Sequence, residues 1–215
     1  MTLTLPGKVI AASGFDCMSH ALESITARAW PRRLNPARGV NRPVSQGANP
    51  FSDALAGEAL RAVGKFLVRA VNDASDVEAR TEMMFAATQA GIAFNAAGCH
   101  LPHGLSYPVS GLTRVFHLDG YPAAKSLVPH GMAVVLNNPR CGATPRRALP
   151  SATCTAQHAW APRRATRGRK TRAEALAGRV IDMMRATGMP NGLADLASPS
   201  PMSTRWPPDP SRSTG

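Results

Sequence analysis

Apolar side chains recur every three or four residues along several stretches of the chain, which is the period of an α-helix. In one stretch, residues 55–70, they form a single face and follow Ser52 and Asp53, whose side chains are of the type that caps a helix N-terminus. The apolar positions are Leu55, Ala59, Ala62, Val63, Phe66, Leu67 and Ala70. The pattern predicts a helix that begins at this cap and buries one face.

Three more stretches have the same helical period. The first covers residues 15–27. Ser75 and Glu78 have the spacing of a capping box and predict the start of the second. The third covers residues 174–187 and is followed by Gly188, a residue type that commonly terminates a helix. All three stretches are therefore predicted to be helices.

Composition divides the chain into four segments. Residues 1–139 carry most of the helical pattern and are expected to form one helical domain, in which four prolines and two glycines over residues 30–50 predict a long loop. Residues 140–172 are rich in Arg, Pro, Ala and Thr and have no sustained apolar period, so no regular structure is predicted for them. The helical pattern returns over residues 173–197. Five prolines over residues 198–215 predict a disordered tail.

The overall composition is typical of a globular protein. Of the 215 residues 44% are hydrophobic and 18% are charged, which disfavours wholesale disorder. No apolar run reaches the roughly 18 residues that would span a bilayer, so we expect a soluble protein without a membrane partner. The four cysteines form no CxxC pair, which favours free thiols in a reducing compartment. We therefore expect a cytoplasmic location, with the mitochondrion as the alternative in a eukaryote.

The positive charge of the chain is concentrated in one segment. Residues 140–172 contain eight arginines, one lysine and no acidic residue, and they account for most of the net charge of +12. Such a segment could bind nucleic acid through its phosphates, with an affinity that depends strongly on salt. Because it has no interleaved aromatic residues and no recognisable binding fold, we expect no specific nucleic-acid partner.

Several candidate metal ligands lie in the first segment. Asp16 and His20 are four residues apart, so on a helix both side chains project from one face. Alternatively, Asp16 is only a helix cap and His20 a surface residue with ordinary hydrogen bonds. His100 and His103 flank a proline and precede a glycine, which predicts a tight bend, and His130 stands between a proline and a glycine that would orient its imidazole. One carboxylate and at least three imidazoles suit divalent iron, zinc, cobalt or nickel.

Three motifs resemble a known family. They read Gly-Phe-Asp-Cys-Met-Ser-His-Ala-Leu-Glu-Ser, His-Gly-Leu-Ser-Tyr-Pro-Val-Ser-Gly and Val-Pro-His-Gly-Met-Ala. Over residues 4–139, and again over residues 175–196, the sequence resembles the metal-binding C-terminal domain of the iron-containing alcohol dehydrogenases. The resemblance implies an all-α fold, the helical domain of the dehydroquinate synthase-like architecture. It implies that the metal, iron in the first place and zinc in the second, is held by Asp16, His20, His103 and His130.

Two features resemble the hydroxyacid-oxoacid transhydrogenase branch of that family, the loop over residues 30–50 and Tyr107, which stands where most members have a second histidine. The resemblance implies hydride transfer between a hydroxyacid such as 4-hydroxybutyrate and 2-oxoglutarate through NAD, with the metal polarising the substrate hydroxyl. Arg42 and Gln46 are candidates for binding a substrate carboxylate, or are residues of a solvated loop. Tyr107 is a candidate catalytic residue that hydrogen-bonds substrate or cofactor, or is a packing residue. We expect His100 to have a structural role beside the metal ligands.

The sequence departs from the family pattern in two places. No glycine-rich dinucleotide motif and no βαβ alternation precede Asp16, so we expect the N-terminal α/β dinucleotide domain to be absent and the chain to be truncated and inactive alone. Over residues 140–172 the family pattern is interrupted. Our hypothesis is a pair of compensating frameshifts, with another shift after Leu196. It would be refuted if neither alternative reading frame of the gene encodes a family-like helix there.

An alternative function belongs to a different class. The chain could be a helical module that binds a metal without catalysis and is completed in trans by a separate dinucleotide-binding domain. The expected partners are otherwise a small hydroxyacid or oxoacid and, in a homo-oligomer, a second copy of the chain.

Overall fold

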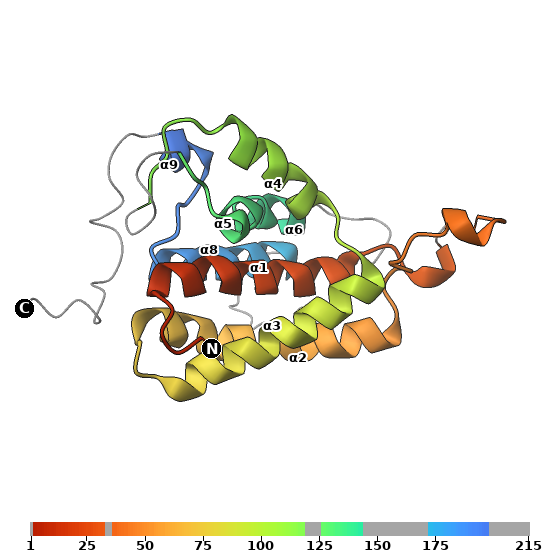
Figure 1. Ribbon diagram of the computed structural model, residues 1–215, viewed down its shortest axis with the longest axis horizontal. Helices are drawn as coiled ribbons and strands as arrows, with labels where there is room; N and C mark the ends of the chain where they lie inside the picture. Colours follow the sequence, from red (N-terminus) through yellow and green to blue (C-terminus); the bar gives the residue numbers. More distant parts are fainter. Residues whose placement is uncertain (1, 33–35, 119–125, 144–171, 198–215) are drawn as a thin grey trace, which may run out of the picture.

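The computed structural model describes residues 2–32, 36–118, 126–143 and 172–197 (Figure 1). Within these ranges the chain is helical, and its only β-type pairing is an isolated bridge between Ala29 and Ala48. The all-α prediction is therefore confirmed. The predictions for most of residues 140–172 and for residues 198–215 lie outside the described residues.

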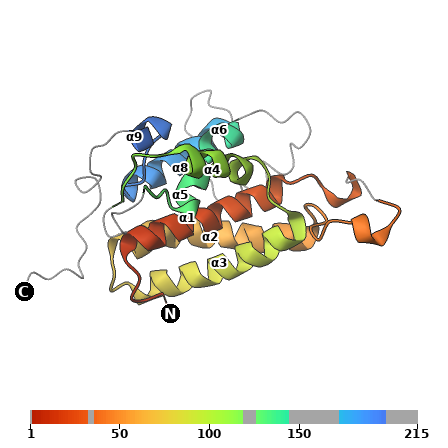
Figure 2. The same ribbon diagram turned by 45° about the horizontal axis from the view of Figure 1, so that its top comes forward.

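One long helix, α1, lies between two layers of helices. On one side it packs against α2 and α3, and on the other side lie α4, α5, α6 and α8 (Figures 1 and 2). The bounds of the helices are Gly7–Thr26 for α1, Pro50–Asn72 for α2, Val77–Ala97 for α3, Leu101–Leu112 for α4, His130–Val135 for α5, Asn138–Ala143 for α6, Arg172–Ala186 for α8 and Leu193–Ala197 for α9. Because neighbours cover both sides of α1, it is buried along most of its length.

Helix α1 begins eight residues before the predicted start. The backbone N–H groups of Val9 and Ile10 donate to the carbonyl of Pro6, and the apolar residues that follow continue the buried face toward the N-terminus. Asp16 therefore lies inside the helix, and the alternative in which it caps the helix is wrong. The spacing argument holds, since Asp16 and His20 remain one turn apart on one face.

The predicted cap of α2 is wrong by three residues. Asn49 is the N-cap, and its Oδ1 accepts from the N–H groups of Phe51 and Ser52 at 3.1 Å each. The hydroxyl of Ser52 accepts in turn from the Asn49 N–H, which completes a capping box. Pro50 allows this earlier start, because the first residue of a helix needs no N–H donor and has the fixed φ angle of proline.

The predicted cap of α3 is also displaced. Asp76, and not Ser75, accepts from the N–H of Ala79 at 2.9 Å, while Ser75 bonds to Asp73. Glu78 does not close a capping box but pairs with Arg69 of α2, 2.7 Å away. The longer-range ion pair therefore replaces the local bond that the spacing predicted.

The structure contradicts one predicted interruption of the helices and confirms another. The predicted bend around His103 is the start of α4, because Pro102 fits the first turn of a helix as well as it fits a bend. The predicted end of the helix over residues 174–187 is confirmed. Gly188 has a φ of 68°, and Met189 N–H donates back to the carbonyl of Met184 at 2.9 Å.

The close approach of α5 to α1 depends on Gly131. A Cβ atom at this position would overlap the carbonyl oxygen of Ala12 and lie 2.9 Å from the Cβ of Asp16. Only glycine permits the two helices to touch at this point. Next to this contact, Asn138 Nδ2 donates to the hydroxyl of Ser19 at 2.6 Å in the buried interior. Gly131 and Asn138 thus set the position of α5 and the start of α6 on α1.

The predicted loop ends before Pro50, which begins α2, and is confirmed over its described residues, 30–32 and 36–49. It contains two single-turn 3-10 helices, Trp30–Arg32 and Gly39–Asn41, and extends away from the helical body (Figures 1 and 2). Its second end is held by the backbone N–H of Gln46, which donates to the carbonyl of Ala96 at 2.7 Å. The loop is therefore anchored next to the junction of α3 and α4.

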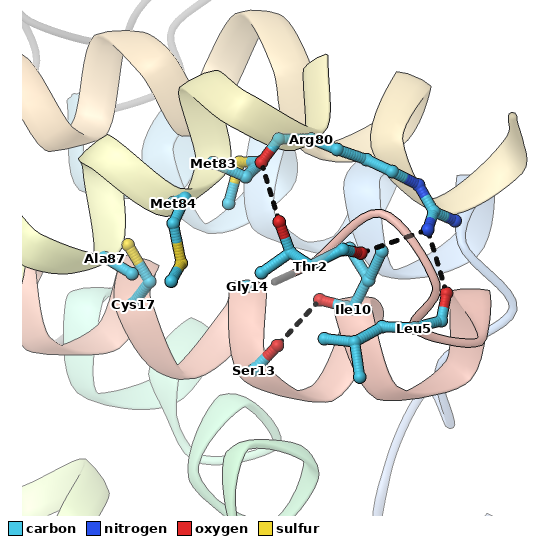
Figure 3. A pocket seen from close by; sticks show the side chains of 10 residues that line it. All are labelled: Thr2, Leu5, Ile10, Ser13, Gly14, Cys17, Arg80, Met83, Met84 and Ala87. Carbon is cyan, nitrogen blue, oxygen red and sulfur yellow. Dashed lines mark hydrogen bonds between the residues drawn. The ribbon is translucent and has the colours of Figure 1, made fainter. Parts of the chain in front are cut away.

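A buried arginine holds the segment that leads into α1. Arg80 of α3 is 2% exposed, and its guanidinium donates to the carbonyl oxygens of Thr2, Leu3 and Leu5 at 2.6–3.2 Å. Beside it, between α1 and α3, lies a cavity of about 230 Å³ lined mostly by apolar side chains (Figure 3).

None of the described helices is both long and apolar enough to cross a membrane.

Candidate metal centre

Four side chains from three helices meet at the layer of α4 and α5 on α1. Asp16 and His20 come from α1, His103 from the first turn of α4, and His130 is the first residue of α5. These are the four residues that the sequence motifs single out, and the structure brings them together from positions up to 114 residues apart.

The distances within this cluster are short. Asp16 Oδ1 lies 3.3 Å from His103 Nε2 and 3.8 Å from His130 Nε2. The rings of His20 and His103 are stacked with centroids 4.5 Å apart, and the far face of His20 stacks on Phe94 at 4.1 Å. Phe94 therefore holds the His20 ring against the cluster.

Two atoms of the cluster are buried without a hydrogen bond. They are Asp16 Oδ1 and His103 Nε2, which face each other. Because nearly all buried polar atoms in proteins are hydrogen-bonded, such a pair needs another partner. One ligand atom each from Asp16, His103 and His130 lies within 4.8 Å of the others, and a carboxylate with imidazoles suits a divalent transition metal. The residues present therefore fit a metal ion.

Glu23 was missed by the sequence analysis. It is 1% exposed, and its carboxylate accepts three hydrogen bonds: from His103 Nδ1 at 2.8 Å, from the His103 backbone N–H at 2.9 Å and from the His100 N–H at 3.1 Å. A carboxylate only accepts, so Nδ1 of His103 carries a proton toward Glu23, and Nε2 is the ring nitrogen that faces Asp16. A carboxylate behind a histidine in this way orients it as a metal ligand.

Glu23 could have been found from spacing. It stands three residues after His20 and seven after Asp16, so all three lie on the same stripe of α1. The spacing does not show that the Glu23 carboxylate contacts His103 of α4. The carboxylate also takes the place of a side-chain cap for α4, whose N-cap residue His100 makes no capping bond of its own.

The two carboxylates determine the protonation of His103. Burial disfavours its charged form, but the neighbouring side chains of Asp16, Cys99 and Glu23 raise the pKa of His103 to about 12. Without a metal the ring therefore also carries a proton on Nε2, which a bound metal would displace. Burial likewise works against the charge of Asp16, yet the imidazoles of His103, His20 and His130 hold the pKa of Asp16 below its ordinary value. Burial lowers the pKa of His20, which keeps this imidazole neutral and able to donate a lone pair. The centre thus has excess negative charge, which a cation balances.

The other predicted site residues do not join this cluster. The side chains of Arg42 and Gln46 are exposed and bond within their own loop, Arg42 to the carbonyl of Pro36 and Gln46 to that of Pro43. Tyr107 lies on α4 with 70% of its surface exposed. Their roles stay predictions. His100 bonds through Nε2 to the hydroxyl of Thr26 at 2.7 Å, in keeping with its expected structural role.

Solved structures with the same fold define the class of protein. The chain is similar to an alcohol dehydrogenase from Oenococcus oeni, with a TM-score of 0.69 and 24% identity over 91% of this chain and 43% of that one. It is also similar to a sulfoacetaldehyde reductase from Bifidobacterium kashiwanohense, solved in complex with NAD+, with a TM-score of 0.64 and 25% identity over 97% of this chain and 48% of that one. The fold is thus the helical domain found in these oxidoreductases.

The sequence places the chain more narrowly. Residues 42–200 match the model of the C-terminal domain of the Fe-containing alcohol dehydrogenase family, and the chain belongs to that family. Within it, the chain is 48% identical over 139 residues to the mitochondrial hydroxyacid-oxoacid transhydrogenase of Bos taurus. That alignment covers 64% of this chain but only 30% of the transhydrogenase, so the chain spans about a third of its curated relatives.

Proposed function

We propose that the chain is the metal-binding part of an oxidoreductase that transfers hydride between a hydroxyacid and a 2-oxoacid through NAD. The observation that carries the proposal is the facing pair of buried atoms without hydrogen bonds, Asp16 Oδ1 and His103 Nε2, with His20 and His130 beside them. The similarity to transhydrogenases supports the substrate class. The NAD+ complex of the related reductase supports the cofactor.

In this proposal each residue has a separate task. Asp16, His20, His103 and His130 would hold the metal. The bound metal would act as a Lewis acid that lowers the pKa of the substrate hydroxyl. Glu23 holds the proton of His103 on Nδ1 and keeps Nε2 directed at the site.

The remaining tasks fall to residues outside the cluster. Tyr107 would hydrogen-bond the substrate, and Arg42 and Gln46 would bind its carboxylate after releasing their own loop carbonyls. NAD would be bound by an α/β domain, which the described residues do not include. The chain by itself is therefore expected to bind metal without turning over substrate, and we propose a mitochondrial location because the transhydrogenase relatives are mitochondrial.

Metal binding by the isolated chain tests the proposal. Elemental analysis of the purified protein should find close to one divalent metal, iron or zinc, per chain. The variants His103→Ala and His130→Ala should lose it, whereas His117→Ala, an exposed histidine on the segment after α4, should retain it. A wild-type chain without metal after reconstitution, or full retention in both ligand variants, would overturn the proposal.

A second candidate function is a metal-binding module without catalysis that is completed in trans. It is favoured by the fact that all four candidate ligands come from described helices of this one chain. Adding a separately produced dinucleotide-binding domain of the family to the metal-loaded chain distinguishes the two. Reduction of NAD by a hydroxyacid supports the oxidoreductase, and its absence with metal still bound supports the module.

A further inference from the structure

Cys99 lies at the edge of the proposed metal centre. It is part of the short link between α3 and α4, directly after Gly98, which ends α3 with a φ of 91°. A left-handed conformation of this kind favours glycine, and it turns the chain so that the next residue lies beside the start of α4. The Cys99 sulfur, a nitrogen of His20 and a nitrogen of His103 all lie within 4.8 Å of one another.

This trio differs from the one formed by Asp16, His103 and His130. Both share His103, whose two ring nitrogens face opposite surroundings: Asp16 on the Nε2 side and Glu23 on the Nδ1 side. His103 is 8% exposed and its Nε2 has no hydrogen-bond partner. Cys99 is therefore not an isolated surface thiol, because its sulfur lies beside the buried imidazole of His103 and interacts with both His103 and Glu23.

We propose that Cys99 supplies a thiolate ligand to the cation held by His20 and His103, so that the centre binds thiophilic divalent metals such as Zn²⁺, Co²⁺ or Cd²⁺. This inference rests on the proposed metal centre. Thiolate ligands select softer metals than carboxylates do, whereas the set of Asp16 and imidazoles has no such preference. One chain would thus present two overlapping ligand sets, one with oxygen and nitrogen and one with sulfur and nitrogen.

Binding of the metal by Cys99 releases one proton. When the metal–sulfur bond forms, the S–H bond of Cys99 breaks and the metal takes the place of the proton. The proton can leave directly to solvent, since Cys99 is exposed while His20 and His103 lie deeper. No oxidation or reduction is involved.

Cobalt is the probe that tests this assignment. Titration of the full chain with Co²⁺ should produce visible d–d bands from the bound ion and a near-ultraviolet thiolate-to-cobalt charge-transfer band. Cys99→Ser should retain the visible bands and lose the charge-transfer band. Cys141→Ser, at a half-buried thiol on α6, is the matched control and should retain both.

The outcomes separate this inference from the proposal on which it rests. Visible bands without a charge-transfer band in the wild type, or a charge-transfer band that survives in Cys99→Ser, would overturn the role of Cys99 and leave the metal centre standing. No visible bands in the wild type would overturn both. Circular dichroism of Cys99→Ser should match the wild type, and Cys99→Ala gives the same spectroscopic test if the serine variant does not fold.

Discussion

The substitution Glu23→Gln tests whether the carboxylate of Glu23 orients His103, because it removes the negative charge and one acceptor atom while it keeps the size of the side chain. Glutamine has the same size, but one carboxylate oxygen becomes an NH₂ group that donates. Glu23 Oε2 accepts from both His103 Nδ1 and the His100 N–H, and Oε1 accepts from the His103 N–H. With the NH₂ at the Oε2 position, Nδ1 of His103 must give up its proton in order to accept. The proton that then stays on Nε2 removes the lone pair with which this nitrogen would bind a metal. With the NH₂ at the Oε1 position, the backbone N–H of His103 loses its acceptor.

The size of the effect follows from these contacts. Loss of a carboxylate that orients a metal-bound histidine typically weakens metal binding by about 10–100-fold, which is about 1.4–2.8 kcal/mol. In either orientation of the amide a buried N–H is left without its acceptor, which costs about 1–3 kcal/mol of folding free energy. We therefore expect Glu23→Gln to fold with a lowered stability and to bind Zn²⁺ at least tenfold more weakly than the wild type.

Isothermal titration of the reconstituted chain with Zn²⁺ measures the affinity, and chemical denaturation measures the free energy of unfolding. The ¹⁵N shifts of His103 report the tautomer, which loss of stability alone would not change. Glu78→Gln is the matched control, because this glutamate is 61% exposed and pairs with Arg69 on the opposite layer from the metal centre. Wild-type Zn²⁺ affinity in Glu23→Gln, with the proton of His103 still on Nδ1, would refute the reasoning.

Two further predictions concern packing. Gly131→Ala should lower the free energy of unfolding by about 1–3 kcal/mol, because its Cβ would collide with the backbone of Ala12, and it should weaken metal binding by displacing α5. Gly57→Ala, on α2 with no atom within 4 Å of the added Cβ, should be neutral or stabilising in the same denaturation experiment. Arg80→Met should cost about 3 kcal/mol or more, since three carbonyls lose a charged donor. An equal effect of Arg61→Met, at an exposed position, would contradict this explanation.

Much of the fold could be predicted because its information is local. The period of apolar residues places α2, α3 and α8, and the spacing of Asp16 and His20 puts both side chains on one face wherever the helix begins. The helix starts were less predictable. Asn49 and Asp76 are capping residue types, as are the predicted Ser52 and Ser75. Which of these neighbouring residues caps the helix depends on Pro50 and on the contacts of the flanking helices.

The sequence by itself thus determined the helical class, the four candidate ligands and, through its motifs, the family. Only the tertiary structure decided that the ligands converge, that Glu23 faces His103 across 80 residues of chain, and that Cys99 lies beside two imidazoles. It also showed why a glycine follows His130, since Gly131 is where α5 touches α1. The physical reason is that spacing along a helix specifies which side chains share a face, whereas the partner of that face is set by packing between segments that are distant in the chain.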